Sequence, residues 1–473
     1  MSSEKNEESQ SNQEYKAMGT RKQKLCPMAE SSNYGSSSSS SPVTRIPEDH
    51  LISILLLLPI ESILCFAATC KKLKSLAYSD SLWESICRRD WGQIPVDALK
   101  RGYTPLQRLP WKKLYQQLYQ LDSVYCHRLN SPDGDLILPT PRASHSLNFV
   151  SGSLVLFGGG CEGGRHLDDT WVAYVGNDFT RTLKWQKTNS GIPSGRFGHS
   201  CVVIGDHLVL FGGINDLGIR QNDTWVGQVT IHETLGITLM WRLLDVGPEA
   251  PPPRGAHAGC CVDGKRMLIH GGIGPSGTRL GDTWILDSSD DLRFGTWREI
   301  AVGPGPPPRS GHTLTHIGRK QTILFGGRGT GFEVLNDVWV LDSSDEGRWE
   351  WRQLLFEMRN IPHGFSLSRV GHSASLIIGR RVLIYGGEDS YRHRKDDFWV
   401  LDVENSSFRK LWRRVETKGD RVNCRSFHGA CVDESGRYLY VYGGMVDGMV
   451  QPGDPAGLRF DGESFMVDLV LQS

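Results

Sequence analysis

The chain has 473 residues with 53 basic and 53 acidic side chains, so its formal net charge is zero. This balance excludes a global electrostatic attraction to nucleic acid or to anionic membranes, and recognition must come from local surfaces. Eleven scattered cysteines contain no C-x-x-C zinc motif and indicate a reduced compartment. The polar N-terminus lacks the apolar core of a signal peptide, and no window reaches the ~18 apolar residues that span a bilayer. We therefore expect a cytoplasmic or nuclear protein.

The first 121 residues divide into three predicted segments. Residues 1–43 are rich in Ser, Glu, Gln, Asn and Lys and end in SSNYGSSSSSSP, so we predict a disordered leader that cannot repay the entropy of ordering. Residues 44–91 carry apolar side chains at helical spacing and are expected to form a small helical domain. Residues 92–121 hold another short helical run, LQRLPWKKLYQQLYQL, which we interpret as a helical spacer.

Seven consecutive apolar residues, from Ile54 to Ile60, lie within the predicted helical domain. A segment of this length buries little surface, since domains below ~60 residues are already marginal in stability. We therefore expect a partner protein to cover its apolar face. The alternative is that these side chains are the internal core of a small helical domain, and some of them are expected to be core in either case.

A repeated unit of 54 to 60 residues occurs six times after residue 122. Each unit has an Arg-x-x-His pair and then a strand-like run that ends in two glycines; in five units a Trp follows 13 residues after the first glycine. The sixth unit has Phe465 instead. The pairs are Arg142/His145, Arg196/His199, Arg254/His257, Arg309/His312, Arg369/His372 and Arg425/His428. The diglycines are Gly158 and Gly159, Gly212 and Gly213, Gly271 and Gly272, Gly326 and Gly327, Gly386 and Gly387, and Gly443 and Gly444. The tryptophans are Trp171, Trp225, Trp284, Trp339 and Trp399.

Each unit contains four short strand-like segments joined by turns, the pattern of one blade of a β-propeller. Glycine pairs permit positive φ and close approach of the backbone, and tryptophans fill the wedge between neighbouring sheets. The sixth unit ends after three strands, and the segment SVYCHRL at 123–129 is expected to supply the fourth. The predicted fold is an all-β six-bladed propeller over residues 122–473, closed by the strand 123–129 and preceded by the all-α domain.

Both parts of the chain resemble known families. The repeats are similar to kelch repeats, and residues 44–91 resemble an F-box. The matching F-box features are Ile46-Pro47, Leu51, the run from Ile54 to Pro59, Ile63, the element ATCKKLKSL from Ala68 to Leu76, and Leu82-Trp83. Ile46 stands where that family usually has Leu, a mild departure. Together these features resemble the F-box/kelch-repeat proteins, especially those of plants.

This resemblance implies a non-catalytic substrate-recognition subunit of an SCF-type (Skp–cullin–F-box) ubiquitin ligase, with no cofactor and no metal. The F-box would bind a Skp-type adaptor and through it a cullin, while the propeller would bind the protein to be ubiquitinated. The expected adaptor-binding residues are Pro47, Leu51, Ile54, Leu55, Leu58, Pro59, Ile63, Leu82 and Trp83. Two alternatives stay open: a protein-binding kelch scaffold that is not coupled to ubiquitination, and a metal-dependent kelch enzyme.

The six Arg-x-x-His pairs suggest a ring of histidines that could bind metal or transfer protons. Repetition in every unit argues against this, because a catalytic group is needed once and a bond between blades is needed six times. We predict that these buried Arg and His side chains pair with backbone carbonyls. The Asp of each Asp-x-Trp is expected to be a turn residue that bonds its own backbone.

The loops between the diglycine and the Trp differ most from unit to unit, so we expect the substrate-binding residues there. Arginines recur at their tips, together with aromatic and apolar side chains of the kind that dominate binding energy. The candidates are Arg165, Arg220, Arg279, Arg328, Phe332, Tyr391, Arg392, Arg394 and Met449. The hypothesis is a surface that captures an acidic or phosphorylated segment through bidentate arginine contacts; for any single Arg, a solvated loop tip is the alternative.

Overall fold

The computed structural model describes residues 42–101, 109–130, 138–175, 182–232, 236–300, 303–344, 347–356, 361–362, 364–403, 411–448 and 458–470. The predicted leader, apart from its last two residues, lies outside these ranges. The chain divides into two compact units, 1–51 and 52–473. The described part of the first unit holds a 3-10 turn, η1 (Pro42–Arg45), and the start of helix α1 (Glu48–Leu55).

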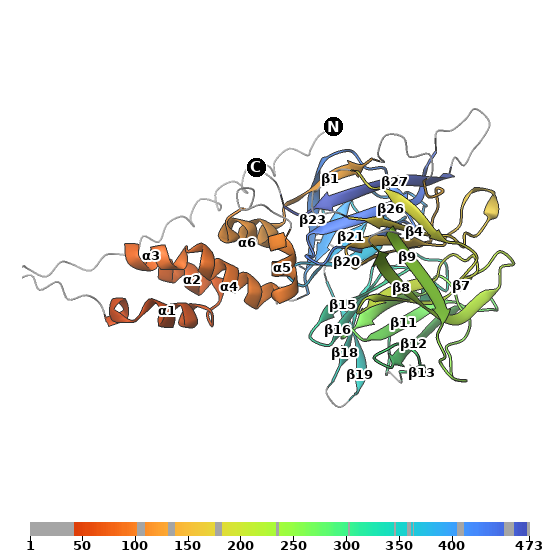
Figure 1. Cartoon of the computed structure of the whole chain (residues 1–473), viewed down its shortest axis with the longest axis horizontal. Helices are drawn as coiled ribbons and strands as arrows, with labels where there is room; N and C mark the ends of the chain where they lie inside the picture. The colour runs from red at the N-terminus through yellow and green to blue at the C-terminus, as the bar shows by residue number, and fades with distance from the viewer. Residues whose placement is uncertain are drawn as a thin grey trace, which may run out of the picture. The chain divides into compact units, whose positions relative to one another are not determined.

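The helical part of the chain continues through five further helices in the described residues (Figure 1). They are α2 (Ile60–Ala67), α3 (Lys71–Ala77), α4 (Asp80–Trp91), α5 (Gln93–Arg101) and α6 (Trp111–Gln120). Pro59 is the N-cap of α2 and so separates it from α1, as its fixed φ and missing N–H favour. Gly92 ends α4 with φ +91°, a conformation that glycine adopts without steric cost. None of the described helices is long and apolar enough to cross a membrane.

The core of these helices is built around aromatic rings. Trp83 is 1% exposed, its Nε1 donates to the Ala77 carbonyl at 2.9 Å, and its ring meets that of Tyr115 edge to face. The same apolar cluster contains Leu118 of α6 and Ile377 of a propeller strand. Arg381, which is 7% exposed, donates to the backbone carbonyls at the end of α6. The spacer helix is thus anchored by burial and by hydrogen bonds.

Four of the propeller blades are four-stranded antiparallel sheets in chain order. Blade 1 has β2 (Ser146–Val150), β3 (Ser153–Phe157), β4 (Thr170–Tyr174) and β5 (Trp185–Asn189). Blade 2 has β6 (Ser200–Ile204), β7 (His207–Ile214), β8 (Arg220–His232) and β9 (Gly236–Leu243). Blade 3 has β10 (Ala258–Val262), β11 (Arg266–Ile273), β12 (Arg279–Ser288) and β13 (Gly295–Glu299). Blade 4 has β15 (Thr313–Gly318), β16 (Gln321–Phe325), β18 (Val338–Ser343) and β19 (Trp349–Leu354), and the short pair β14 (Arg309–Ser310) and β17 (Arg328–Gly329) lies at its end.

Blades 5 and 6 join into one nine-stranded sheet. Blade 5 has β20 (Ser373–Ile377), β21 (Arg381–Tyr385), β22 (Phe398–Leu401) and β23 (Trp412–Gly419). Blade 6 has β24 (Arg425–Ser426), β25 (Gly429–Val432), β26 (Tyr438–Asp447), β27 (Leu458–Asp468) and β1 (Ser123–Leu129). The segment 123–129 is therefore a strand that pairs antiparallel with β27 in the sixth blade, as the sequence predicts (Figure 1).

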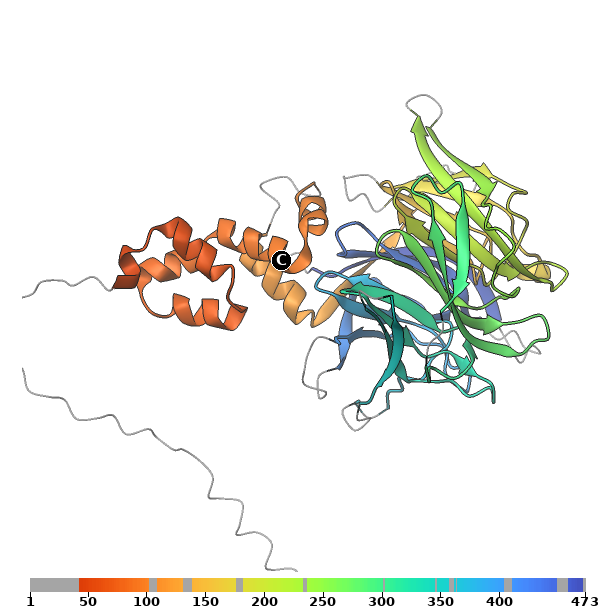
Figure 2. The ribbon, with the colours of Figure 1, turned by 90° about the horizontal axis from the view of Figure 1, so that it is seen from below.

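A parallel pairing between β1 and β23, which the sequence does not indicate, joins these two blades. Gly419 at the end of β23 has φ +84°, and a Cβ there would lie 2.3 Å from the Cys126 carbonyl oxygen. The absence of a side chain at this position therefore permits the close approach of the two strands. In Figure 2 the sheets follow one another in chain order, and an apolar cluster joins Leu147 of blade 1 to Tyr440 of blade 6.

Candidate docking and recognition surfaces

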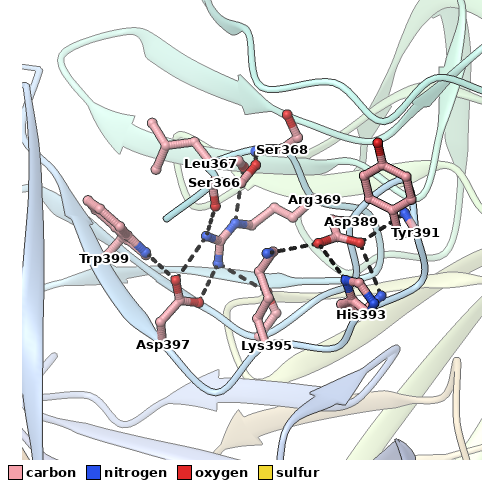
Figure 3. Close-up of polar contacts among 11 residues, drawn as sticks. Ser366, Leu367, Ser368, Arg369, Asp389, Tyr391, His393, Lys395, Asp397 and Trp399 are labelled. Carbon is pink, nitrogen blue, oxygen red and sulfur yellow. Dashed lines mark hydrogen bonds and ion pairs between the residues drawn. The ribbon is translucent and has the colours of Figure 1, made fainter. Parts of the chain in front are cut away.

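The Arg of each repeat forms a buried ion pair, as the close-up of blade 5 shows (Figure 3). Arg369, which is 0% exposed, donates from Nη1 to Asp397 Oδ1 at 3.1 Å and to the Gly386 carbonyl at 3.1 Å. Trp399 Nε1 donates to the other oxygen of Asp397 at 2.6 Å. The same pairing occurs in Arg142–Asp169, Arg196–Asp223, Arg254–Asp282 and Arg309–Asp337.

These contacts confirm that the repeated Arg bonds a carbonyl and correct the role expected for the Asp. The Asp of each Asp-x-Trp joins the Arg and the Trp of its own blade and is not simply a turn residue. Burial opposes ionisation of Asp169, but the hydrogen bonds and charge of Arg142 outweigh it and lower the pKa of this carboxyl. In blade 6, Arg425 pairs instead with Asp461 at 3.0 Å and with Glu463 at 3.2 Å. We conclude that these side chains join the strands and loops within each blade.

The repeated His links neighbouring blades in five of the six units; among the described residues, neither ring nitrogen of His145 makes such a bond. His257 Nε2 hydrogen-bonds with Ser200 Oγ at 2.8 Å, and His372 Nε2 with Thr313 Oγ1 at 3.0 Å. Burial, reinforced by the charge of the adjacent Arg196, lowers the pKa of His199 to about 3. The ring is therefore neutral near neutral pH and serves as a hydrogen-bonding spacer between blades. In the described residues no group of three or more His, Cys, Asp or Glu side chains is arranged to hold a metal.

The helices expose apolar side chains at the connection of α1 and α2 and along α2. Leu57 is 86% exposed, Ile54 47% and Leu64 39%. We call these three residues the α1–α2 apolar surface. Arg89 donates to the carbonyls of Leu56 and Leu58, at 3.0 and 2.8 Å, and so fixes the turn that carries Leu57. Exposed apolar side chains on neighbouring elements are candidates for contact with a partner protein.

The structure places the expected adaptor-binding residues in two environments. Leu55, Ile63, Leu82 and Trp83 are each 1% exposed or less and form the core beneath the surface. Leu51 is 3% exposed and is likewise buried. Pro47, Ile54 and Pro59 are exposed and Leu58 is half-buried, so these four remain candidates for direct contact. Leu57 and Leu64 were not among the predicted residues. Each lies in an apolar stretch of the sequence, and this is the feature from which they could have been predicted.

Two of the arginines predicted to bind substrate are held by a carboxylate that the sequence analysis missed. Glu388, which is 6% exposed, lies 3.4 Å from the guanidinium groups of both Arg328 and Arg394. Ser426 Oγ donates to Glu388 at 3.2 Å, and Arg394 also contacts Asp447 at 2.7 Å. The Arg394 side chain is only 4% exposed. These arginines are therefore engaged within the propeller, and Glu388 directly follows the fifth diglycine.

A cation–π pair links blades 3 and 4. The Arg279 guanidinium lies 4.6 Å from the centre of the Phe332 ring, and its Nε donates to Ser310 Oγ at 3.2 Å. Partial burial and the nearby Arg328 charge lower the pKa of Arg279. Phe332 is nevertheless 68% exposed and has φ +65°, so this aromatic side chain is held at the surface by a constrained turn.

The remaining candidates lie in different environments. Arg165 and Arg392 are exposed and make no ion pair within the described part of the chain. Arg220 donates to the Gly218 carbonyl of its own turn at 2.7 Å. Tyr391 is 82% exposed, and Asp389 accepts hydrogen bonds from the backbone of its turn (Figure 3). Met449 lies outside the described residues. The loop surface therefore mixes arginines, carboxylates and exposed aromatic rings and is not a uniformly basic patch.

Comparison with known proteins gives matches for both parts. Residues 43–89 match the F-box-like model, and residues 112–291 and 232–411 match the KLHDC2/KLHL20/DRC7 Kelch-repeats domain. An F-box/kelch-repeat protein of Arabidopsis thaliana is 55% identical over 93% of this chain and 95% of its own length. Adagio-like protein 1 of Oryza sativa subsp. japonica is 29% identical over 83% of this chain and 61% of its own length. The solved structure of YjhT matches at a TM-score of 0.49 and 14% identity, over 70% of this chain and 95% of that one.

Proposed function

Because the chain belongs to the F-box/kelch-repeat proteins, we propose that it is the substrate-recognition subunit of an SCF-type ubiquitin ligase. In this proposal the helices bind a Skp-type adaptor and through it a cullin. The propeller binds the protein to be ubiquitinated. The observation that supports it most is the α1–α2 apolar surface, which falls inside the residues that match the F-box-like model.

The physical reason for adaptor binding is the free energy of burying this surface. Leu57 is 86% exposed, and complete burial of a leucine side chain contributes roughly 1.5–3 kcal/mol. Ile54 and Leu64 add further apolar area within the same surface. The buried Leu55 and Trp83 fix the helices beneath it, so little order has to be gained on binding.

We place substrate recognition on the loops that follow the diglycines. Phe332 and Tyr391 supply exposed aromatic rings, and Arg165 and Arg392 supply exposed positive charge. Such side chains dominate the energy of protein interfaces. An acidic or phosphorylated segment remains our proposed ligand, and it would be read mainly by Arg165 and Arg392, because Arg394 is engaged by Glu388 and Asp447. The chain would act without its own catalytic residues, by holding the substrate near the conjugating enzyme.

The proposal is tested by affinity purification from cells of the wild type and of the double variant Ile54→Asp, Leu57→Asp. The variant should lose the adaptor and the cullin while proteins bound to the propeller remain. Met240→Asp is the matched control, since Met240 is 76% exposed on a propeller strand, and it should retain the adaptor. Retention of adaptor and cullin by the double variant would contradict the proposal. A complex that holds the adaptor but never ubiquitinates a captured partner would favour the scaffold alternative.

A further inference from the structure

Three of the repeat units carry an arginine three residues before the repeated Asp, namely Arg220, Arg279 and Arg394. In each of them the backbone of this arginine pairs with the residue that follows the diglycine. That residue is Glu388 beside Arg394, but it is an isoleucine beside Arg220 and Arg279. Arg394 is therefore neutralised by a carboxylate, whereas the described part of the chain gives Arg220 and Arg279 no ion pair.

The side chain of Arg279 is fixed by contacts with blade 4. Its Nε donates to Oγ of Ser310 at 3.2 Å, and Ser310 is itself buried and paired through its backbone with Arg328. The centre of the Phe332 ring lies 4.6 Å from the guanidinium. A guanidinium that is held at its Nε and against an aromatic ring has little rotamer freedom left to lose, so the entropic cost of binding a ligand is small.

The two Nη atoms of Arg279 form an edge that is open to a ligand. Within the described residues neither atom makes a hydrogen bond or an ion pair, and neither is among the buried atoms that lack a partner, so both are accessible. Arg220 differs, because its Nη1 donates to the Gly218 carbonyl of its own turn at 2.7 Å and its Nε is buried. The parallel N–H groups of a guanidinium match the two oxygens of a carboxylate.

The surroundings of Arg279 do not compensate its positive charge. Partial burial and the charge of Arg328 lower the pKa of Arg279, and they outweigh the opposite effect of the exposed Glu333. Arg328 itself contacts Glu388 at 3.4 Å. An oxyanion that binds Arg279 would therefore supply the missing negative charge, and it would not have to displace a carboxylate that is already bonded there.

We propose that the Nη edge of Arg279 binds a carboxylate of the protein segment that the propeller recognises. This inference rests on the proposed function and narrows its ligand to a singly charged acid. A phosphate dianion would bring a second negative charge near Glu333, and the other nearby cation, Arg328, is already engaged by Glu388. Phe332, which is 68% exposed, would contact an apolar side chain next to the carboxylate.

The carboxylate can belong to an acidic side chain or to the end of a chain, and the chemistry of recognition is the same in both cases. The test therefore measures the binding of short peptides to the full-length chain by ligand-observed NMR. The reference probe is N-acetyl-Leu-Glu-Leu amide. Its Gln counterpart removes the charge, its phosphoserine counterpart adds one, and the Gln peptide with a free carboxyl end moves the carboxylate to the end of the chain.

A carboxylate peptide should bind about tenfold more tightly than the amidated Gln peptide, because only the carboxylate accepts charge-assisted hydrogen bonds from Arg279. Tighter binding of the Glu peptide than of the free-carboxyl Gln peptide would identify a side chain as the source. The reverse order would identify a chain end, and equal binding would show that Arg279 accepts both. Equal binding of all four peptides, tightest binding of the phosphoserine peptide, or no saturable binding would overturn the proposal.

Three variants locate the carboxylate. Arg279→Gln should abolish the preference for a carboxylate peptide over the amidated Gln peptide. Arg279→Lys should retain only part of it, because an ammonium group has no paired N–H edge. Arg293→Gln is the matched control: Arg293 lies in the turn between β12 and β13 of the same blade, is 75% exposed, and should bind the peptides like the wild type. A preference that survives in Arg279→Gln at an unchanged melting temperature would contradict the assignment.

The outcome is separable from that of the adaptor test. A chain that binds a Skp-type adaptor and shows no preference for the carboxylate peptides would contradict this inference alone. A chain that prefers the carboxylate peptides and binds no adaptor would contradict the ligase proposal alone.

Discussion

The repeated polar side chains of the propeller and some apolar side chains of the helices lie in opposite environments. In the propeller the repeated Arg and His are buried, the Arg is paired with the repeated Asp, and the His is bonded to a side chain of a neighbouring blade, although such residues are common at active sites. In the helices Leu57 and Ile54 are exposed, although such residues are common in cores. The difference teaches that recurrence marks a structural role here, whereas exposed apolar side chains that no repeat explains are candidates for contact with another molecule.

The largest expected effect comes from breaking one buried ion pair of the propeller. Arg369→Ala removes the partner of Asp397 and should lower the free energy of unfolding by about 3–5 kcal/mol, because it leaves a buried carboxylate uncompensated. Urea denaturation measures the loss. Arg293→Ala is the control, since its side chain is 75% exposed and its pair with Asp291 should contribute about 0–1 kcal/mol. Similar losses in the two variants would contradict the structural role of the repeated Arg.

A pair of leucine variants sharpens the contrast within the helices. Leu55→Ala should cost about 2–5 kcal/mol of stability, because Leu55 is 1% exposed in the core. Leu57→Ala, two residues away, should change stability by less than about 0.5 kcal/mol, because Leu57 is 86% exposed. Thermal unfolding of the two variants checks this. A large loss for Leu57→Ala would make it a core residue and remove it from the proposed adaptor surface.

Between pH 7.5 and 5.5, the pH dependence that each buried histidine imparts is smaller than the losses expected for Arg369→Ala and Leu55→Ala. Burial, with the charge of Arg425, lowers the pKa of His428 to about 3 from an ordinary 6.5. The unfolded chain binds the proton first, so stability is complete above pH 6.5 and falls between pH 6.5 and about 3, by up to ~1.4 kcal/mol per pH unit for each such His. Melting temperatures at pH 7.5, 6.5 and 5.5 measure it. A propeller equally stable at pH 7.5 and 5.5 would show that these histidines are not buried as neutral rings.

Two kinds of feature could be predicted from the sequence: those that recur in every unit, and the closing strand, which is found by counting the strands of the sixth unit. The diglycines, the buried Arg and the closing strand 123–129 each follow from comparing six units, because every unit needs the same bond at the same place. The parallel pairing of β1 with β23 could not be predicted, since it depends on how two neighbouring blades approach at Gly419. A pattern within one blade contains no such information.

The recognition residues were predicted less completely for a similar reason. Glu388 engages Arg328, a residue 60 positions away, and only the folded propeller brings them together. Leu57 was missed because it lies in the turn after α1, which ends at Leu55, so helical spacing does not apply to it. Contacts of this kind need coordinates.

The most direct test of the account is a calorimetric titration of the purified full-length chain with a purified Skp-type adaptor. The account predicts saturable 1:1 binding with a negative heat-capacity change, the mark of apolar burial, and its loss in Ile54→Asp, Leu57→Asp. A chain that gives no binding heat and stays monomeric beside the adaptor would contradict the account.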